Sequence, residues 1–153
     1  MQKGRYTNLK IFVTAAMSPE GQKIGGSIYF DFAPISDTTA DRVKEATGFD
    51  IHGYGHALDG SAVVHILNRH GENGTALKDF PNQMPLTTDD LSMIAGVVEN
   101  ADTIEPAGKK NRIIFKKRVN GCFIVVEEKR NRFKKLIPVT ARKEKAAASP
   151  STS

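Results

Sequence analysis

The pattern of hydrophobic and polar positions changes along the chain, and each change predicts a different element. Leu9–Val13 is a short apolar run, and apolar residues alternate with polar ones over 28–32, so both segments are predicted to be strands. The segment 19–26 between them holds a proline and three glycines and predicts a loop. Asp37-Thr38-Thr39 offers N-caps for a helix that ends at Gly48, and a loop is expected over 52–60.

Two amphipathic helices are predicted in the middle of the chain. The first covers 61–70, with Ser61 as N-cap and Gly71 in the left-handed conformation that ends many helices. Residues 71–85 are polar and interrupted by glycine and proline, which predicts an exposed loop. The second helix follows a cap at 87–90 and has one apolar face that must be buried. Its apolar positions are Leu91, Ile94, Ala95 and Val98.

The last third of the chain has the period of strands. Runs over 111–118, 122–128 and 134–141, with Asn120-Gly121 as a hairpin turn, predict a three-stranded antiparallel meander. Pro138 cannot donate to a ladder, which places it at an edge or a bulge. The polar segment 143–153 is predicted to be disordered. Helices segregated from an antiparallel sheet define the α+β class.

Charge is distributed unevenly. Residues 1–108 hold 8 Lys+Arg against 14 Asp+Glu, whereas residues 109–145 hold 14 against 3. A basic region of this kind suits a polyanion such as nucleic acid, because each neutralised phosphate releases condensed counterions. The alternative is a solvated basic face that keeps the protein soluble.

The single cysteine and the hydropathy pattern bear on where the protein is expected to be located. Cys122 is the only cysteine, so the chain forms no internal disulfide, and we expect this thiol in the core. The N-terminal segment lacks the apolar run of a signal peptide, and no segment has the length of a membrane span, so no membrane association is expected.

The helix over 61–70 carries two histidines and an arginine. At about 100° per residue, His70 falls on the apolar stripe, whereas His65 and Arg69 fall on the polar face, so the three are not expected to share one face. His70 is either a buried, hydrogen-bonded histidine or a proton-transfer group. In the last turn, the helix dipole raises its pKa and burial lowers it. An imidazole beside clustered cations fits phosphate chemistry better than proteolysis.

A metal site is the other interpretation of the histidines. His52 and His56 are four residues apart and could bind a metal together with His65 or His70. Glycines beside this pair disfavour the helix that it needs, and neither an HExxH motif nor a cysteine cluster is present. We therefore expect no metal and no cofactor. The phosphate-loop, GxGxxG and GxSxG motifs are also absent.

Three ordered blocks of the chain resemble a known superfamily. They are GYGHALDGSAVVHILNRHG, MPLTTDDLSMIAGVVENADTI and IIFKKRVNGCFIVVEEKRNRFKKLIPVTA. Together they are similar to the phage-associated branch of the barnase, EndoU, colicin tRNase and RelE-like (BECR) nucleases, over about residues 38–142. Such domains often lie at the C-termini of phage head-associated proteins or polymorphic toxins. The resemblance implies N-terminal helices packed on a four- or five-stranded antiparallel sheet. Residues 1–37 are expected to add strands and loops to the same domain.

The resemblance also implies which residues form the site. His70 is the first acid–base candidate, and the second is His65 or His56, while Arg69 and Thr140 hold the phosphate. Asp89-Asp90-Leu91 matches the family's DDL helix, and Ala141-Arg142 stands where an aromatic residue usually follows the terminal threonine. The substrate-binding candidates are cations of the basic region: Arg112, Lys116, Lys117 and Lys134.

The activity implied by the resemblance is metal-independent cleavage of RNA by a toxin or effector. The ribose 2′-OH attacks the adjacent phosphorus and leaves a 2′,3′-cyclic phosphate and a free 5′-OH. The implied partners are RNA, with tRNA as one candidate, and an acidic immunity protein. The expected site of action is the cytoplasm, reached in some cases by delivery as part of a larger phage or secreted protein. Two alternatives stay open: a catalytically silent nucleic-acid-binding module and a metal-dependent phosphodiesterase.

Overall fold

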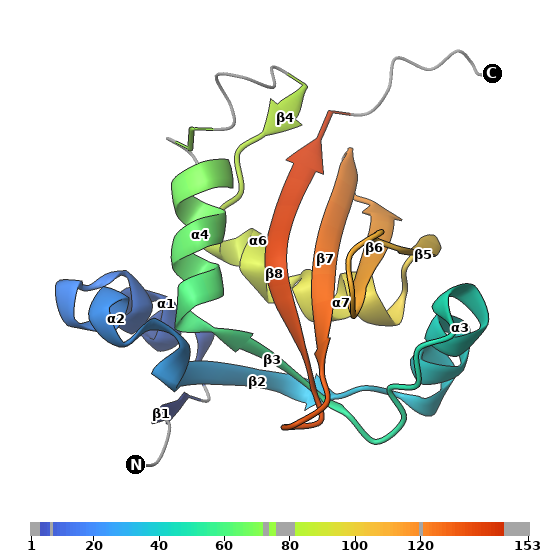
Figure 1. Cartoon of the computed structure of the whole chain (residues 1–153). Helices are drawn as coiled ribbons and strands as arrows, with labels where there is room; N and C mark the ends of the chain where they lie inside the picture. Colours follow the sequence, from blue (N-terminus) through green and yellow to red (C-terminus); the bar gives the residue numbers. More distant parts are fainter. Residues whose placement is uncertain (1–3, 7, 72–73, 76–81, 120, 146–153) are drawn as a thin grey trace.

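The computed structural model describes residues 4–6, 8–71, 74–75, 82–119 and 121–145. Helices pack on one mixed sheet, which confirms the predicted α+β class (Figure 1). The elements are β1 (Gly4–Tyr6), α1 (Leu9–Met17), α2 (Pro19–Ile24), the 3-10 turn η1 (Gly25–Ser27), β2 (Ile28–Pro34), α3 (Asp37–Thr47), β3 (Gly55–Asp59), α4 (Gly60–His70), β4 (Gln83–Met84), α6 (Thr88–Ser92), α7 (Ile94–Glu99), β5 (Thr103–Pro106), β6 (Arg112–Arg118), β7 (Cys122–Arg130) and β8 (Lys135–Glu144).

The sheet combines the predicted meander with shorter strands from the first half of the chain. Its order is β1-β2-β3-β8-β7-β6-β5, and β4 pairs with the end of β8. Strands β5 to β8 are antiparallel, whereas β3 joins β8 in parallel through only two residue pairs. Among the described residues the sheet therefore has eight strands rather than four or five. The strand predicted over 28–32 is confirmed as β2. The other additional strands, β1, β3, β4 and β5, have five residues or fewer, and the hydrophobic pattern does not mark them.

A β-bulge in β8 decides which of its side chains share a face. Glu127 of β7 pairs with Pro138 and Val126 pairs with Thr140, so Val139 is the extra residue. The predicted position of Pro138, at an edge or a bulge, is confirmed. Because Ile137 lies opposite Glu128 and Thr140 lies opposite Val126, Ile137 and Thr140 point to the same face despite their odd and even numbers.

The predicted strand at Leu9–Val13 is wrong, because these residues begin helix α1. The side chain of Asn8 caps the helix by accepting a hydrogen bond from the backbone N–H of Ile11 at 3.1 Å. Phe12, Val13 and Ala16 bury one face. A short apolar run is compatible with either a strand or a buried helix, and only the packing of α1 distinguishes the two.

The predicted loop over 19–26 is also wrong, since it forms α2 and η1. Ser18 caps α2, and Pro19 occupies the first turn, where its missing N–H is not needed. Gly21 is a packing residue rather than a turn residue. A Cβ at this position would lie 1.7 Å from the carbonyl oxygen of Ala15, so the glycine allows α2 to approach α1.

The elements around α4 differ from prediction at both ends. Residues 55–59 of the expected loop form β3, which is largely buried between β2 and β8. Asp59, rather than Ser61, caps α4 by accepting a hydrogen bond from the N–H of Ala62 at 2.8 Å. Gly71 follows the helix with φ of −76°, so the expected left-handed C-cap is wrong. The N–H of Leu86 instead donates to the carbonyl of His70 at 2.8 Å.

Several other features also differ between the prediction and the structure. The helix predicted after residue 87 forms, with the expected capping box at Thr87 and Asp90, but it breaks into α6 and α7 at Met93. Helix α3 begins one residue after Ser36, its N-cap, and ends at Gly48 as predicted. Cys122 is only partly buried rather than a core residue.

Two segments predicted to be irregular contain strand residues. Within the expected loop over 71–85, Gln83–Met84 forms β4, while residues 72–73 and 76–81 lie outside the described residues. Within the expected tail, β8 continues through Glu144 and pairs there with both β4 and β7. Residues 146–153 lie outside the description.

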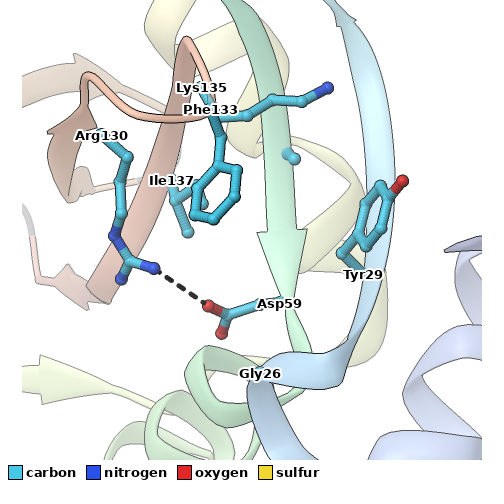
Figure 2. A pocket seen from close by; sticks show the side chains of 8 residues that line it. Gly26, Tyr29, Asp59, Arg130, Phe133, Lys135 and Ile137 are labelled. Carbon is cyan, nitrogen blue, oxygen red and sulfur yellow. Dashed lines mark ion pairs between the residues drawn. The ribbon is translucent and has the colours of Figure 1, made fainter. Parts of the chain in front are cut away.

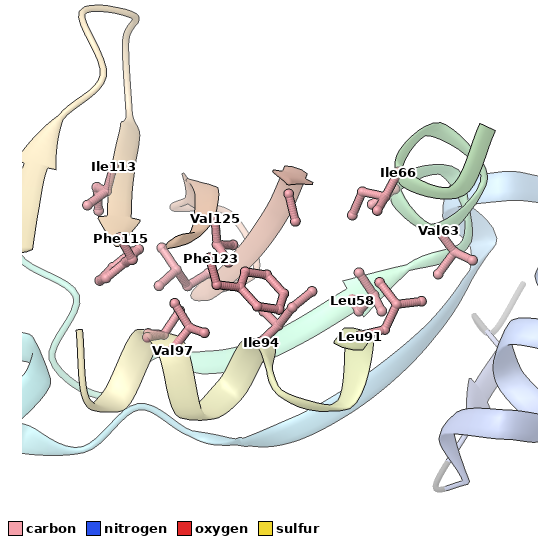
Figure 3. Packing of buried hydrophobic residues seen from close by; sticks show 14 of the residues in the cluster. Leu58, Val63, Ile66, Leu91, Ile94, Val97, Ile113, Phe115, Phe123 and Val125 are labelled. Carbon is pink, nitrogen blue, oxygen red and sulfur yellow. The ribbon is translucent and has the colours of Figure 1, made fainter. Parts of the chain in front are cut away.

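One hydrophobic cluster fixes the helices against the sheet (Figure 3). Ile66 of α4, Leu91 of α6, Ile94 of α7 and Phe123 of β7 are fully buried in it, and the buried residues of α1 belong to the same cluster. Each large apolar side chain buried in this way contributes roughly 1.5–3 kcal/mol. The cluster therefore sets where α4 lies beside β8. None of the described helices is long and apolar enough to cross a membrane.

Candidate functional site

A pocket of about 400 Å³ opens where the C-terminal half of α4 meets β8 and β4. Helix α4 packs along β8, and β4 pairs with the C-terminal end of that strand (Figure 1). Three segments far apart in sequence thus supply the walls of one pocket. Its lining residues are His65, Arg69, His70, Gln83, Thr140, Arg142 and Glu144.

The two histidines of α4 face this pocket together. The ring centroids of His65 and His70 lie 6.3 Å apart, and the ring planes are inclined by 74°. As expected, His70 belongs to the buried stripe of α4 and His65 does not, yet both line this pocket together with Arg69.

The contact of His70 with Gln83 favours one tautomer of the neutral ring. Its Nδ1 lies 2.9 Å from Oε1 of Gln83, and because a carbonyl oxygen only accepts, Nδ1–H is the donor. Nε2 then carries the lone pair of the neutral ring. Burial lowers the pKa of His70, the Gln83 hydrogen bond raises it, and the positive charge of Arg69 lowers it further, so that the net direction is downward. Burial thus outweighs the effects that would raise this pKa.

Alternate residues of β8 form the opposite wall. Thr140, Arg142 and Glu144 line the pocket, and Nε of Arg142 donates to Glu144 at 3.1 Å. The sequence points to Thr140 as a site residue, whereas Arg142 enters only as a departure from the family pattern. Extending the predicted strand by one residue, from 141 to 142, places both side chains on one face. Gln83, in contrast, lay in a predicted loop, and no sequence signal marked it.

His56 does not line this pocket. It is 2% exposed, and its Nε2 lies 2.7 Å from Oε2 of Glu127, which is fully buried. Burial raises the pKa of Glu127 against the opposing influence of His56. The second carboxylate oxygen, Oε1, has no hydrogen-bond partner among the described residues. The structure therefore places His56 in a buried pair with Glu127, and its ring lines a different pocket, beside Phe32 and Lys135.

Two of the four predicted substrate-binding cations lie on the sheet face that carries Arg142, and two lie elsewhere. Arg112 and Lys116 lie on the same face of the meander as Arg142, since Lys116 and Arg142 both pair with Ile124. Each already forms an ion pair, Arg112 with Glu128 and Lys116 with Glu105, both at 3.3 Å. Surface pairs of this kind are weak, contributing about 0–1 kcal/mol, so a phosphate can compete for either cation.

The other two cations lie elsewhere. Lys117 donates to the carbonyl oxygen of Asn100 at 3.0 Å, which directs it toward the end of α7. Lys134 lies in the turn before β8, with φ of 49°, at the opposite end of that strand from the pocket.

The first two histidines considered for a metal site have other partners, since His56 pairs with Glu127. His52 contacts Asp41 and Asp50, each at 2.7 Å, and these hydrogen bonds raise its pKa. Within the described residues, no three His, Cys, Asp or Glu side chains are grouped so as to hold a metal ion. Asp90 of the DDL helix completes its own capping box and accepts from Lys143 at 3.3 Å, so it ties α6 to β8.

Comparison with known proteins identifies the family. A model of the phage-Barnase-EndoU-ColicinE5/D-RelE like nuclease3 family matches residues 34–149. No curated protein and no solved structure matches the chain. The match covers most of the chain, including α4, β4 and β8, which form the pocket. The chain therefore belongs to the phage-Barnase-EndoU-ColicinE5/D-RelE like nuclease3 family.

Proposed function

We propose that this protein is a metal-independent endoribonuclease that cleaves RNA by transesterification in the pocket between α4 and β8. One observation carries the proposal. Two imidazoles, two guanidinium groups and a hydroxyl line a single pocket in a chain that belongs to a nuclease family. Transesterification needs a base, an acid and cationic or hydroxyl donors around the phosphate, and this pocket offers each type.

His70 is the proposed general base. Its lowered pKa keeps the ring neutral near pH 7, and Gln83 occupies Nδ1, so Nε2 is the atom that accepts the proton of the ribose 2′-OH. The 2′ oxygen forms a bond to the adjacent phosphorus as this proton leaves. A neutral histidine with one fixed tautomer is suited to this step, because no proton has to be removed from the base first.

His65 is the proposed general acid. As the bond between phosphorus and O5′ breaks, its imidazolium gives a proton to O5′, so the products are a 2′,3′-cyclic phosphate and a 5′-hydroxyl. The 6.3 Å separation of the two rings allows one phosphodiester to contact both. Arg69 and Arg142 stabilise the charge on the phosphate oxygens, and Thr140 donates a hydrogen bond.

The nucleophile in this mechanism belongs to the substrate. DNA has no 2′-hydroxyl and is therefore expected to resist cleavage. The arginines take the cationic role that a metal ion has in many phosphodiesterases. Activity is accordingly expected to persist in EDTA.

The test is incubation of the purified protein with total RNA in EDTA, followed by analysis of the fragment ends. We expect 2′,3′-cyclic phosphate and 5′-hydroxyl ends, and intact DNA in a parallel reaction. His52→Ala is the matched control, because His52 is a surface histidine outside the pocket. Complete absence of cleavage of tRNA, rRNA and synthetic RNA, with and without divalent ions, would contradict the proposal.

The basic face of the meander supports a second candidate function, a nucleic-acid-binding module without catalysis. Arg112, Lys116 and Arg142 lie on this face. A silent module binds RNA with steep salt dependence, and His70→Ala leaves its binding and any toxicity unchanged. A metal-dependent phosphodiesterase differs from both, because EDTA abolishes its activity.

A toxin or effector role is also part of the proposal and implies a protective partner. Because residues 109–145 carry an excess of positive charge, an acidic immunity protein that covers the basic face fits by charge complementarity. Co-expression with acidic proteins encoded nearby tests this. Failure of each to bind or to restore growth would count against it.

A further inference from the structure

A second pocket, of about 190 Å³, lies at the other end of β8 (Figure 2). It takes no part in the proposed chemistry. In Figure 2, Arg130 and Tyr29 lie on either side of the Phe133 ring, and Asp59 lies below it. Its lining residues are Gly26, Tyr29, Ala57, Asp59, Arg130, Phe133, Lys135 and Ile137.

The bulge in β8 places both pockets on one face of the sheet. Lys135 and Ile137 lie opposite Arg130 and Glu128, and beyond the bulge Thr140 and Arg142 lie opposite Val126 and Ile124. All four β7 residues alternate along one face, so their partners share that face as well. Without the extra residue, Thr140 would point away from the side that holds Ile137.

The distance between the pockets suits one nucleic-acid strand. Ile137 and Arg142 lie opposite Glu128 and Ile124, four positions apart on β7, which is about 13 Å at roughly 3.3 Å per residue. An RNA strand with a phosphate between His65 and His70 can therefore extend along β8 and reach the second pocket within a few nucleotides.

The groups in the second pocket are those that hold unpaired bases. Phe133 is 49% exposed, and the partly buried ring of Tyr29 lines the same pocket. Bases stack on aromatic rings and on the planar guanidinium of arginine. The guanidinium of Arg132 lies over the Phe133 ring, 5.5 Å from its centroid, so aromatic and guanidinium groups already meet at this pocket.

Arg130 is held in position before any ligand arrives. Its Nε donates to Glu128 at 2.7 Å, and its guanidinium lies 3.8 Å from the carboxylate of Asp59. Asp59 is itself fixed, because it caps α4. A guanidinium plane held by two carboxylates loses little further freedom when a base stacks on it.

We propose that this pocket binds one unpaired base of the RNA, a few nucleotides from the cleaved phosphodiester. The inference rests on the proposed ribonuclease function and adds a substrate requirement. RNA must be single-stranded both at the cleaved bond and at this neighbouring position. Stems that pair the second position are then poor substrates even when the cleaved bond is accessible.

The first experiment compares Phe133→Ala with the wild type on two substrates. A dinucleoside phosphate contacts only the catalytic pocket, whereas a single-stranded oligonucleotide reaches both. We expect kcat/KM to fall by about 5- to 150-fold for the oligonucleotide and to stay unchanged for the dinucleoside phosphate, the range that corresponds to loss of one stacked base. Ile11→Ala is the control, because Ile11 is another exposed apolar residue, 60% exposed on α1. Equal losses on both substrates would overturn the proposal.

A second experiment does not require cleavage. Binding of a 2′-deoxy-substituted oligonucleotide is measured with the wild type and with Phe133→Ala, and abasic sites are placed at successive positions. One abasic position should weaken wild-type binding and have no further effect in the variant. If the wild type cleaves no RNA but this pattern holds, the ribonuclease proposal fails while the base pocket stands. If Phe133→Ala leaves RNA binding unchanged and weakens only binding of an acidic protein, the pocket belongs to that protein and the inference is wrong.

Discussion

His56 and His70 occupy opposite kinds of environment, although both belong to the block that resembles the family's histidine-bearing segment. His56 is paired with a fully buried carboxylate in the interior of the sheet. His70 is also mostly buried, at 6% exposure, but it borders a pocket that holds His65 and two arginines. Burial alone therefore does not separate a structural histidine from a catalytic candidate. His56 borders a different pocket, with Asp31 and Lys135, so the two histidines differ in the groups that their pockets bring beside them.

The two histidines also differ in the hydrogen-bond partner that each one has. His56 and Glu127 each offset the cost of burying the other's polar group. Removal of either leaves the other buried in a low-dielectric interior without a hydrogen-bond partner. His70 is paired through Nδ1 with the neutral Gln83, so its other nitrogen is left for chemistry. We expect the His56–Glu127 pair to stabilise the fold and the pairing of His70 with Gln83 to serve the proposed catalysis.

The largest expected effect is on catalysis. His70→Ala should lower kcat by about 10²- to 10⁴-fold, because it removes the general base. RNA cleavage rates and thermal unfolding, measured on the same preparation, check the prediction. A variant that cleaves at the wild-type rate would show that His70 is structural, as His56 is expected to be.

The next effect is on stability. His56→Ala should reduce the free energy of unfolding by about 3–5 kcal/mol, since Glu127 then stays buried without its partner. Urea denaturation measures this loss. Folded protein should retain its kcat, in contrast to the His70 variant.

A double variant tests the same cause even if His56→Ala does not fold. His56→Leu combined with Glu127→Leu replaces the pair by apolar side chains and should recover most of the lost stability. If the double variant is less stable than His56→Ala, stranding of the carboxylate is not the cause of the loss.

A smaller effect concerns the pH profile. His70 acts as a base only when neutral, so kcat/KM rises with pH through its lowered pKa. Arg69→Gln removes a positive charge that lowers this pKa, and the acidic limb should move to higher pH. Gln83→Leu removes a hydrogen bond that raises it, and the limb should move to lower pH. Shifts of up to about one unit are expected, from kcat/KM between pH 4 and 8. Shifts of the same sign in both variants would contradict this description of the pocket.

The smallest effect concerns salt. Lys116→Ala should weaken RNA binding almost equally for all sequences and reduce the slope of log K against log [salt] by about 0.7, as expected for one phosphate contact on a single strand. Lys117→Ala is the matched control, because Lys117 is bound to Asn100 and directed away from this face. Equal changes in both variants would mean that the sheet face is not the path of the RNA.

Short-range signals predicted much of the fold. Neighbouring residues alone predict the meander, the capping box at Thr87 and Asp90, and the bulge in β8 beside Pro138. The same kind of signal failed at Leu9–Val13 and over 19–26. There the local pattern fits more than one element, and packing of α1 and α2 decides between them.

The sequence by itself determined that α4 carries His65, Arg69 and His70, and that Thr140 lies on a terminal strand, because helical and strand periods are local properties. Only the tertiary structure decided that these residues meet Gln83 and Arg142 in one pocket and that His56 is enclosed elsewhere with Glu127. The pairing of β4 with β8, the packing of α4 along β8 and the register after the bulge all depend on contacts between distant segments. Such contacts are selected by the burial of one shared core, which no single stretch of sequence contains.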